Sequence, residues 1–242
     1  MTLRTEREEH STPWNGTARF VIVLIMLFGL ILLLMGRVAL AAVFTVYGVI
    51  LVESRIALRQ YIHGFPGASI LVTVIRAAFF FLPLPLLGFP PLNPLSWGVP
   101  VGIVCGLLLQ VWQWRNLQFI LSNDFLAILP PLSPEEKFNQ ALPPILSAIA
   151  QEYFYRGALL YALGRSIGPW AIAVSALLFT CEHIMHVHSR RRFDQYDFIL
   201  QTLLGLSFST IFYFSASLSG CILGHIVYNS VSVLQTVRRK SK

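Results

Sequence analysis

Long apolar segments separated by short polar connections run through most of the chain. They predict helices that span a membrane, since about 20 apolar residues cross the hydrocarbon core of a bilayer. The candidate spans are 20–36, 38–52, 68–87, 98–114, 141–163, 168–186, 198–216 and 218–236. The pattern therefore predicts an all-α, multi-pass membrane protein with eight transmembrane helices in one bundle.

The first two segments are separated only by Gly36-Arg37. One continuous helix over 20–52 would be about 50 Å long at 1.5 Å per residue. The hydrocarbon core is only about 30 Å thick, so we expect a tight helical hairpin instead.

Residues 115–140 do not fit a span. Their apolar positions predict a segment lying at the membrane surface before Pro130-Pro131. The sequence Ser-Pro-Glu-Glu-Lys at 133–137 is typical of a polar helix start.

Basic residues indicate the orientation of the bundle. Of the 18 lysines and arginines, Arg37 and Arg165 alone fall outside when the N-terminus is placed in the cytoplasm. Arg76 and Arg156 fall within spans, and all others fall on the cytoplasmic side. This bias predicts that both termini are cytoplasmic. The expected divisions are a cytoplasmic tail (1–19), N-terminal transmembrane helices (20–97), a transmembrane core (98–236) and a basic cytoplasmic tail (237–242).

The composition supports the membrane interpretation. The chain has 242 residues, of which 55% are hydrophobic and 12% charged, and its mean hydropathy is +0.67. A soluble domain would have roughly 25% charged residues. The net charge of +7 follows from the orienting residues, so it does not indicate nucleic acid as a partner. Cys105, Cys181 and Cys221 are dispersed in apolar surroundings and form no disulfide or zinc pattern.

A charged turn interrupts the fifth apolar segment at Gln151, Glu152 and Arg156. A charge at membrane depth costs several kcal/mol, so such residues pair internally and often mark a site. Glu152 and Arg156 are four residues apart on one helix face, and we expect them to form an ion pair. Gln151 lies about 100° around the helix from Glu152 and should have a different role.

Later spans carry further polar residues. Glu182 and His183 follow Phe179 on one span, and His225 precedes Asn229 by four residues on the last. Each pair alone could simply form hydrogen bonds between helices. His186, His188 and the arginines at 190–192 fit an ordinary polar loop, with a metal-binding cluster as the alternative. Together the polar positions predict one active site.

Three short motifs resemble the CPBP family, which includes the CAAX prenyl endopeptidases and the bacterial Abi-type proteases. They are Glu152-x-x-x-Arg156-Gly157, Phe179-x-x-x-His183 and His225-x-x-x-Asn229. The resemblance covers roughly residues 98–236. It implies a glutamate-dependent intramembrane endopeptidase that acts on a membrane-anchored or lipidated protein or peptide. We expect it in the lipid bilayer of a prokaryotic cell membrane.

The resemblance also implies residue roles. His183 would help to activate water, and His225 and Asn229 would stabilise the oxyanion. The family pattern begins Glu-Glu, whereas this chain has Gln151-Glu152, and a carboxamide cannot act as a general base. Three interpretations remain: Glu152 serves as the base, Glu182 supplies the missing carboxylate, or the chain is a silent homologue that binds a membrane segment in a chaperone-like role.

The same residues bear on possible cofactors and on other functional classes. The family has been described as metallopeptidase-like, and Glu152, His183 and His225 could in principle coordinate a divalent metal. No His-Glu-x-x-His pattern is present, so we predict no tightly bound zinc. A transporter could line a polar pathway with Arg76, Glu152 and Arg156, but no pair of broken helices in matching halves supports it.

Overall fold

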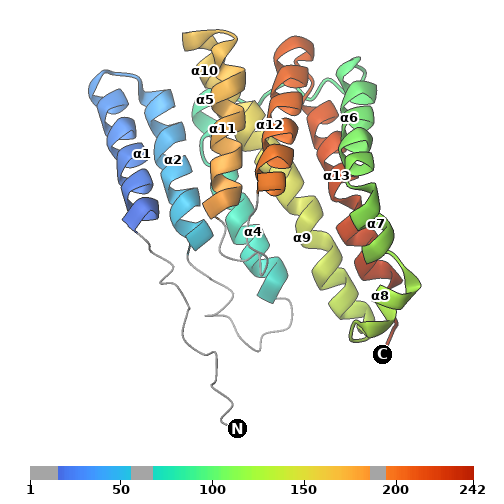
Figure 1. The fold of residues 1–242 in the computed structure, drawn as a ribbon. Coiled ribbons are helices and arrows are strands. Elements are labelled where there is room, and N and C mark those ends of the chain that lie inside the picture. The colour runs from blue at the N-terminus through green and yellow to red at the C-terminus, as the bar shows by residue number, and fades with distance from the viewer. Residues whose placement is uncertain (1–15, 56–67, 186–194) are drawn as a thin grey trace, which may run out of the picture.

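The computed structural model describes residues 16–55, 68–185 and 195–242. Within these ranges the backbone is helical apart from short connections and an isolated bridge between Leu132 and Ser241. The long helices stand side by side along one common direction (Figure 1). The all-α class predicted from the sequence is confirmed.

The helices follow the predicted spans closely. The first half of the chain forms α1 (Gly16–Leu34), α2 (Val38–Arg55), α4 (Ala68–Phe81), α5 (Leu84–Leu87) and α6 (Gly98–Trp112). The second half forms α7 (Trp114–Ile120), α8 (Asn123–Ile128), α9 (Pro134–Glu152), the π-helix η1 (Tyr153–Leu160), α10 (Tyr161–Ile167), α11 (Trp170–Met185), α12 (Gln195–Ser215) and α13 (Leu218–Arg238). The predicted hairpin at Gly36-Arg37 is present, with Gly36 at a φ of 73°.

Two boundaries differ from the sequence prediction. The span predicted at 141–163 lies within a longer helical run that begins at Pro134. Ser133 caps this run, because its hydroxyl accepts from Glu136 N while its own backbone N–H donates to the Glu136 carboxylate. The span predicted at 68–87 divides into α4 and α5 at Pro83, which has no N–H to continue the helix.

The exterior of the bundle is apolar. Leu34 is 80% exposed and Trp170 is 77% exposed, and many other large apolar side chains on the long helices also face outward. By length and composition, the stretches Ile70–Leu87 and Gln195–Ser215 are suited to cross a bilayer. These features support an integral membrane protein, while the eight spans and the cytoplasmic termini stay predictions.

The segment after α6 forms two short helices, α7 and α8. Large apolar side chains are exposed along it, among them Trp114, Phe119 and Ile128. Such side chains suit the boundary between lipid and water. The location of this segment at the membrane surface stays a prediction.

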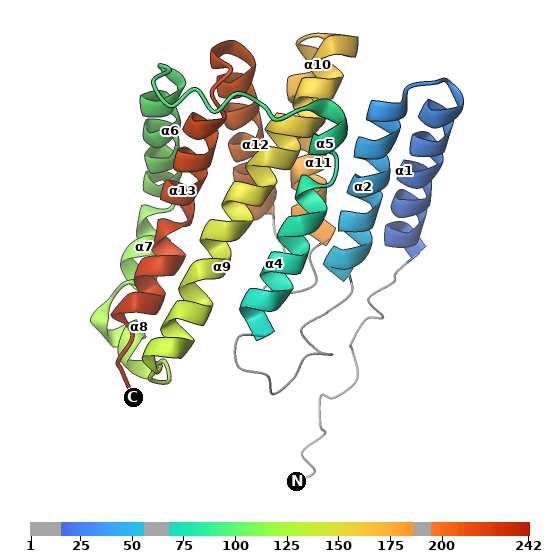
Figure 2. The same ribbon diagram turned by 180° about the vertical axis from the view of Figure 1, so that it is seen from behind.

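Helix α9 occupies the middle of the bundle. It packs against α4 on one side and α13 on the other (Figure 2), while its continuation η1 contacts α11 and α12. Polar side chains that leave α9 and η1 can therefore reach several other helices.

Helices α6 and α13 pack backbone to backbone. Gly98, Gly102 and Gly106 on α6 face Gly220 and Gly224 on α13. A Cβ atom added at most of these positions would overlap a carbonyl group of the opposite helix. The close packing expected at Gly220 and Gly224 is thus present, and it fixes the helix that carries His225.

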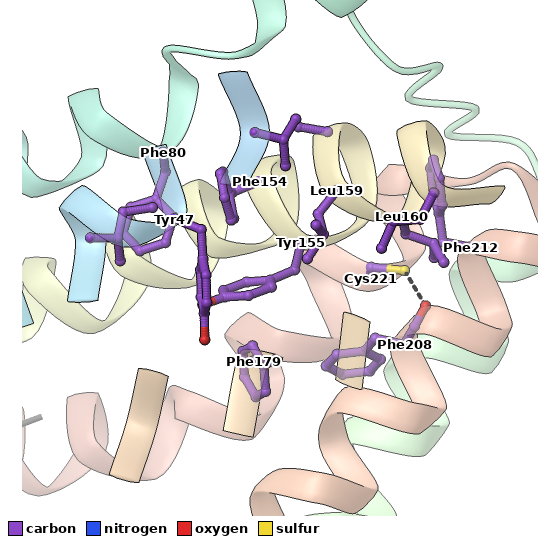
Figure 3. Close-up of a cluster of buried hydrophobic side chains, with 14 of the residues drawn as sticks. Tyr47, Phe80, Phe154, Tyr155, Leu159, Leu160, Phe179, Phe208, Phe212 and Cys221 are labelled. Atoms are coloured by element: carbon purple, nitrogen blue, oxygen red, sulfur yellow. Dashed lines mark hydrogen bonds between the residues drawn. The ribbon is translucent and has the colours of Figure 1, made fainter. Parts of the chain in front are cut away.

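A cluster of buried aromatic side chains joins the N-terminal helices to the core (Figure 3). Phe80 of α4 packs on Phe154 of η1, with ring centroids 5.7 Å apart. Tyr155 packs on Phe179 of α11 at 5.1 Å. The hydroxyl of Tyr47 on α2 donates to a backbone carbonyl of α11 at 2.7 Å. Helices α2 and α4 are therefore part of the packed core.

The C-terminal residues form hydrogen bonds and an ion pair with residues at the start of α9. Leu132 N donates to Lys240 O, and Lys242 N donates to Leu132 O. The ammonium group of Lys242 lies 2.8 Å from Oε1 of Glu136. These contacts tie the end of α13 to the beginning of the helix that carries Gln151 and Glu152.

The close approach of α6 and α13 can be tested with Gly220→Ala. The added methyl group would overlap the backbone of α6, and we expect it to lower the free energy of unfolding by about 1–3 kcal/mol. Thermal or denaturant unfolding of the purified protein in detergent measures this. Gly164→Ala is the matched control, since its Cβ would meet nothing nearer than a ring carbon of Tyr213 at 3.8 Å. Equal stability of the two variants would contradict the packing described.

The tie between Lys242 and Glu136 predicts a pH dependence. The hydrogen bond from Lys242, followed by that from Ser133 N, lowers the pKa of Glu136 from 4.5 to about 2. A carboxyl group whose pKa is lower in the folded chain stabilises the fold above its unfolded pKa and loses this effect as the pH falls through its folded pKa. The contact should therefore persist at about pH 4 and open near pH 2.

Carbon NMR of the Glu136 carboxyl group would follow this titration. In Lys242→Ala the titration midpoint should move up toward the ordinary range of a glutamate. An unchanged midpoint would mean that the contact does not form.

Candidate active site

Three polar side chains of the site leave one continuous helical run. Gln151 and Glu152 end α9, and Arg156 lies in η1. All three are buried. The π-helix replaces the regular hydrogen-bond pattern just after the two polar residues, and such segments are frequent at functional sites.

Glu152 is paired on both of its oxygens. Oε1 lies 2.7 Å from Nδ1 of His225, and Oε2 lies 3.1 Å from Nε of Arg156. The ion pair expected from the spacing of Glu152 and Arg156 is thus present. Because the carboxylate is fully buried, these two partners are what compensates its charge.

Arg156 has three kinds of neighbour. Besides Glu152, its Nη2 donates to the backbone carbonyl of Gly205 at 3.2 Å. Its guanidinium carbon lies 4.9 Å from the ring centroid of Phe179, a distance at which the aromatic face attracts a cation. Arg156 therefore links η1 with α11 and α12.

Glu182 faces the interior of the bundle. Its Oε2 accepts a hydrogen bond from Nε2 of Gln151 at 2.9 Å and lies 3.4 Å from Nδ1 of His183. Its Oε1 lies 2.9 Å from Nη2 of Arg76. The side chain is fully buried, so its carboxylate lies between Gln151 and His183 and faces neither lipid nor a loop.

Arg76 and Glu53 belong to the same cluster, and the sequence did not identify them as site residues. Nε of Arg76 lies 2.6 Å from Oε2 of Glu53. The sequence does indicate that Arg76 has a buried partner, since a lone arginine inside an apolar span needs one. No spacing rule points from it to Glu53 or Glu182, because these residues lie on other helices.

The tautomer of His183 follows from its hydrogen bond. Nδ1 lies 2.9 Å from the carbonyl oxygen of Phe179, which can only accept, so Nδ1 carries a proton. In the neutral ring Nε2 is then unprotonated and can accept a proton. The side chain is 21% exposed, whereas that of His225 is 3% exposed, so His183 is the more accessible of the two imidazoles.

Phe179 brings the two histidines together. Its ring centroid lies 4.4 Å from that of His183 and 6.0 Å from that of His225. Residues from η1, α11 and α13 thus lie around one aromatic side chain. The convergence predicted for the three motifs is present in the geometry, whereas the chemical role of each residue stays a prediction.

Asn229 lies beside α9. Its Nδ2 donates to the carbonyl oxygen of Pro144 at 3.0 Å, two turns before Glu152. An amide nitrogen has two N–H groups, so one of them is left for another acceptor.

A metal centre is not apparent in the described ranges, where no group of three or more His, Cys, Asp and Glu side chains is arranged to hold an ion. His186, His188 and the arginines at 190–192, considered above as a loop or a metal cluster, lie outside the described residues. The absence of tightly bound zinc stays a prediction.

Because Glu152 and Arg156 are both buried, the contribution of each to stability should depend strongly on the presence of the other. Arg156→Met leaves the Glu152 carboxylate buried without its cation, which should cost about 3–5 kcal/mol of unfolding free energy. Glu152→Gln combined with Arg156→Met should cost less than the sum of the single changes, because no isolated charge remains. Unfolding in detergent measures both, with Arg165→Met on the exposed end of α10 as control. Additive costs would mean that the two side chains are not coupled.

Comparison with known proteins bears on the second half of the chain. Residues 138–231 match the family model of the Rce1-like, type II CAAX prenyl endopeptidases. No curated protein and no solved structure matches the chain. The matched range contains all three motifs and Glu182, and it leaves out Glu53 and Arg76. The match supports the resemblance to the CPBP family over residues 138–231.

Proposed function

We propose that the protein is an intramembrane endopeptidase in which Glu182 and His183 activate the attacking water. Its substrate is a membrane-anchored or lipidated protein or peptide, in keeping with the match to the Rce1-like family model. The observation that carries the proposal is the place of the Glu182 carboxylate, one hydrogen bond from Gln151 and 3.4 Å from His183 Nδ1.

The position of Glu182 compensates for Gln151. The family pattern has a carboxylate where this chain has the carboxamide of Gln151. The oxygen of Glu182 lies 2.9 Å from that carboxamide, so a carboxylate from α11 is held beside the position that lacks one on α9. Glu152 is less suited to act as base, because His225 and Arg156 already engage both of its oxygens.

The proton transfers can be assigned to named atoms. Neutral His183 accepts a proton from water at Nε2 while the water oxygen bonds to the scissile carbonyl carbon. The imidazolium that forms is stabilised by Glu182 next to Nδ1, as a buried carboxylate stabilises the histidine of a catalytic triad. His183 then gives the proton to the leaving amine as the carbon–nitrogen bond breaks, which returns the ring to its neutral form.

His225 and Asn229 are suited to bind the oxyanion. Nδ1 of His225 lies 2.7 Å from Oε1 of Glu152, and with Nδ1 donating there, Nε2 can donate to an oxyanion in the imidazolium form of the ring. The second N–H of Asn229 supplies another donor. Fixed donors in a dry site stabilise developing negative charge strongly.

A silent homologue is the second candidate. Gln151 itself favours it, and so does Arg76, which engages the other oxygen of Glu182. In this case the polar site would recognise a membrane segment without cutting it. The proposed enzyme and the silent homologue differ in whether the unaltered protein cleaves a peptide.

The test uses purified full-length protein in phospholipid vesicles with a fluorogenic peptide that ends in a prenylated cysteine motif. Glu182→Gln and His183→Ala should each lower kcat by about 100- to 10,000-fold, the usual contribution of general base catalysis. Glu135→Gln makes the same chemical change at an exposed position of α9 and should leave kcat unchanged.

Moving the carboxylate from residue 182 to residue 151 further distinguishes the proposed enzyme from the silent homologue. Gln151→Glu combined with Glu182→Gln moves the carboxylate back to α9 and should restore part of the activity lost in Glu182→Gln. Full activity of both Glu182→Gln and His183→Ala would refute the proposed mechanism. A folded parent that does not cleave, together with a Gln151→Glu variant that does, would identify a silent homologue.

A further inference from the structure

Two charged residues from the N-terminal helices reach the polar site. Glu53 belongs to α2 and Arg76 to α4, and both helices precede the residues 138–231 that match the Rce1-like family model. Glu53 and Arg76 are 6% and 18% exposed in their side chains. The family motifs do not include them, so their contacts with the site have to be explained from the structure.

Arg76 holds two carboxylates at once. Its Nε lies 2.6 Å from Glu53, and its Nη2 lies 2.9 Å from Oε1 of Glu182. The two contacts use different nitrogens of one planar group. A lysine ammonium is a single point of charge and cannot reproduce this fork.

Glu182 is consequently held at both oxygens by two different helices. Arg76 of α4 engages Oε1, and Gln151 of α9 donates to Oε2. The terminal torsion of a glutamate is broad, so a carboxylate held at one end only can rotate. The two contacts together keep Oε2 facing Nδ1 of His183.

The charges of the cluster have a chemical consequence. One guanidinium lies against two carboxyl groups beside His183. Without Arg76, Glu182 would lose the contact that orients its Oε1 and a cation that compensates its buried charge.

We infer that Arg76 is a positioning residue that fixes Glu182 against His183, and that Glu53 in turn fixes Arg76. The inference rests on the proposed peptidase function and deepens it. Helices α2 and α4 complete an active site whose motifs lie on α9, η1, α11 and α13.

The experiment measures kcat and KM separately in the vesicle assay. Arg76→Gln should lower kcat by at least about tenfold and leave KM nearly unchanged, because the arginine acts on Glu182, which orients His183, and does not touch the substrate. Arg76→Lys should recover part of the loss, since it keeps the charge without the fork. Arg37→Gln, in the exposed turn between α1 and α2, is the matched control and should leave both constants unchanged.

A double-mutant cycle separates positioning from simple stabilisation. Arg76→Gln in a Glu182→Gln background should cause no further loss of kcat, because the group that it positions is gone. Glu53→Gln combined with Arg76→Gln removes both members of the pair on α2 and α4, while Glu182 keeps its contact with Gln151. The kcat of the folded fraction of this variant should still show the loss, with the folded fraction measured by unfolding in detergent.

The outcomes distinguish the two hypotheses. If Glu182→Gln stops cleavage while Arg76→Gln keeps kcat, the positioning role is wrong and the proposed function stands. If the kcat losses of Arg76→Gln and Glu182→Gln multiply when the two changes are combined, Arg76 acts through something other than Glu182. If the folded parent does not cleave at all, the proposed function is wrong, and the inference that depends on it is overturned too.

Discussion

The need to compensate charge away from water governs the arrangement of this bundle. Glu152 and Glu182 are fully buried carboxylates, and each is matched by an arginine and by a polar side chain from another helix. Glu152 couples α9 to η1 and α13, while Glu182 couples α11 to α4 and α9. An unpaired charge would cost several kcal/mol, so the helices cannot shift far without losing these partners. The same contacts that stabilise the fold therefore also set the geometry of the site.

The two carboxylates divide the site into a closed part and an accessible part. Around Glu152 the partners are Arg156 and His225, and all three side chains are almost fully buried. Around Glu182 the partners include His183 and Arg76, whose side chains are partly exposed. Phe179 lies between the two parts and touches both histidines. The buried charge of Glu152 is therefore enclosed, whereas the partners of Glu182 reach the surface of the bundle.

The sequence predicted those features that depend on local spacing. Hydropathy located the helices, the short Gly36-Arg37 connection indicated the hairpin, and the four-residue spacing of Glu152 and Arg156 indicated their ion pair. Apart from the expected meeting of the three motifs, contacts between distant segments were not predictable. The partners of Arg76 lie on two other helices, and nothing in the local sequence orders those helices around it. The direction of Glu182 was left open for the same reason, because rotation of α11 by one residue would turn it toward lipid. The start of α9 was predicted from its capping sequence at 133–137, ahead of the apolar segment that begins at 141.

The glycine contact between α6 and α13 has a consequence for access to the site. Carbonyl groups lie where a Cβ at Gly102, Gly106, Gly220 or Gly224 would be, so a shift of α13 that brings a larger residue to this contact would produce a steric clash. His225 and Asn229 therefore lie on a helix that is held closely against α6. Helices α4 and α11 carry Arg76 and Glu182, so a movement of either helix that opens the site would break the ion pair between these two side chains.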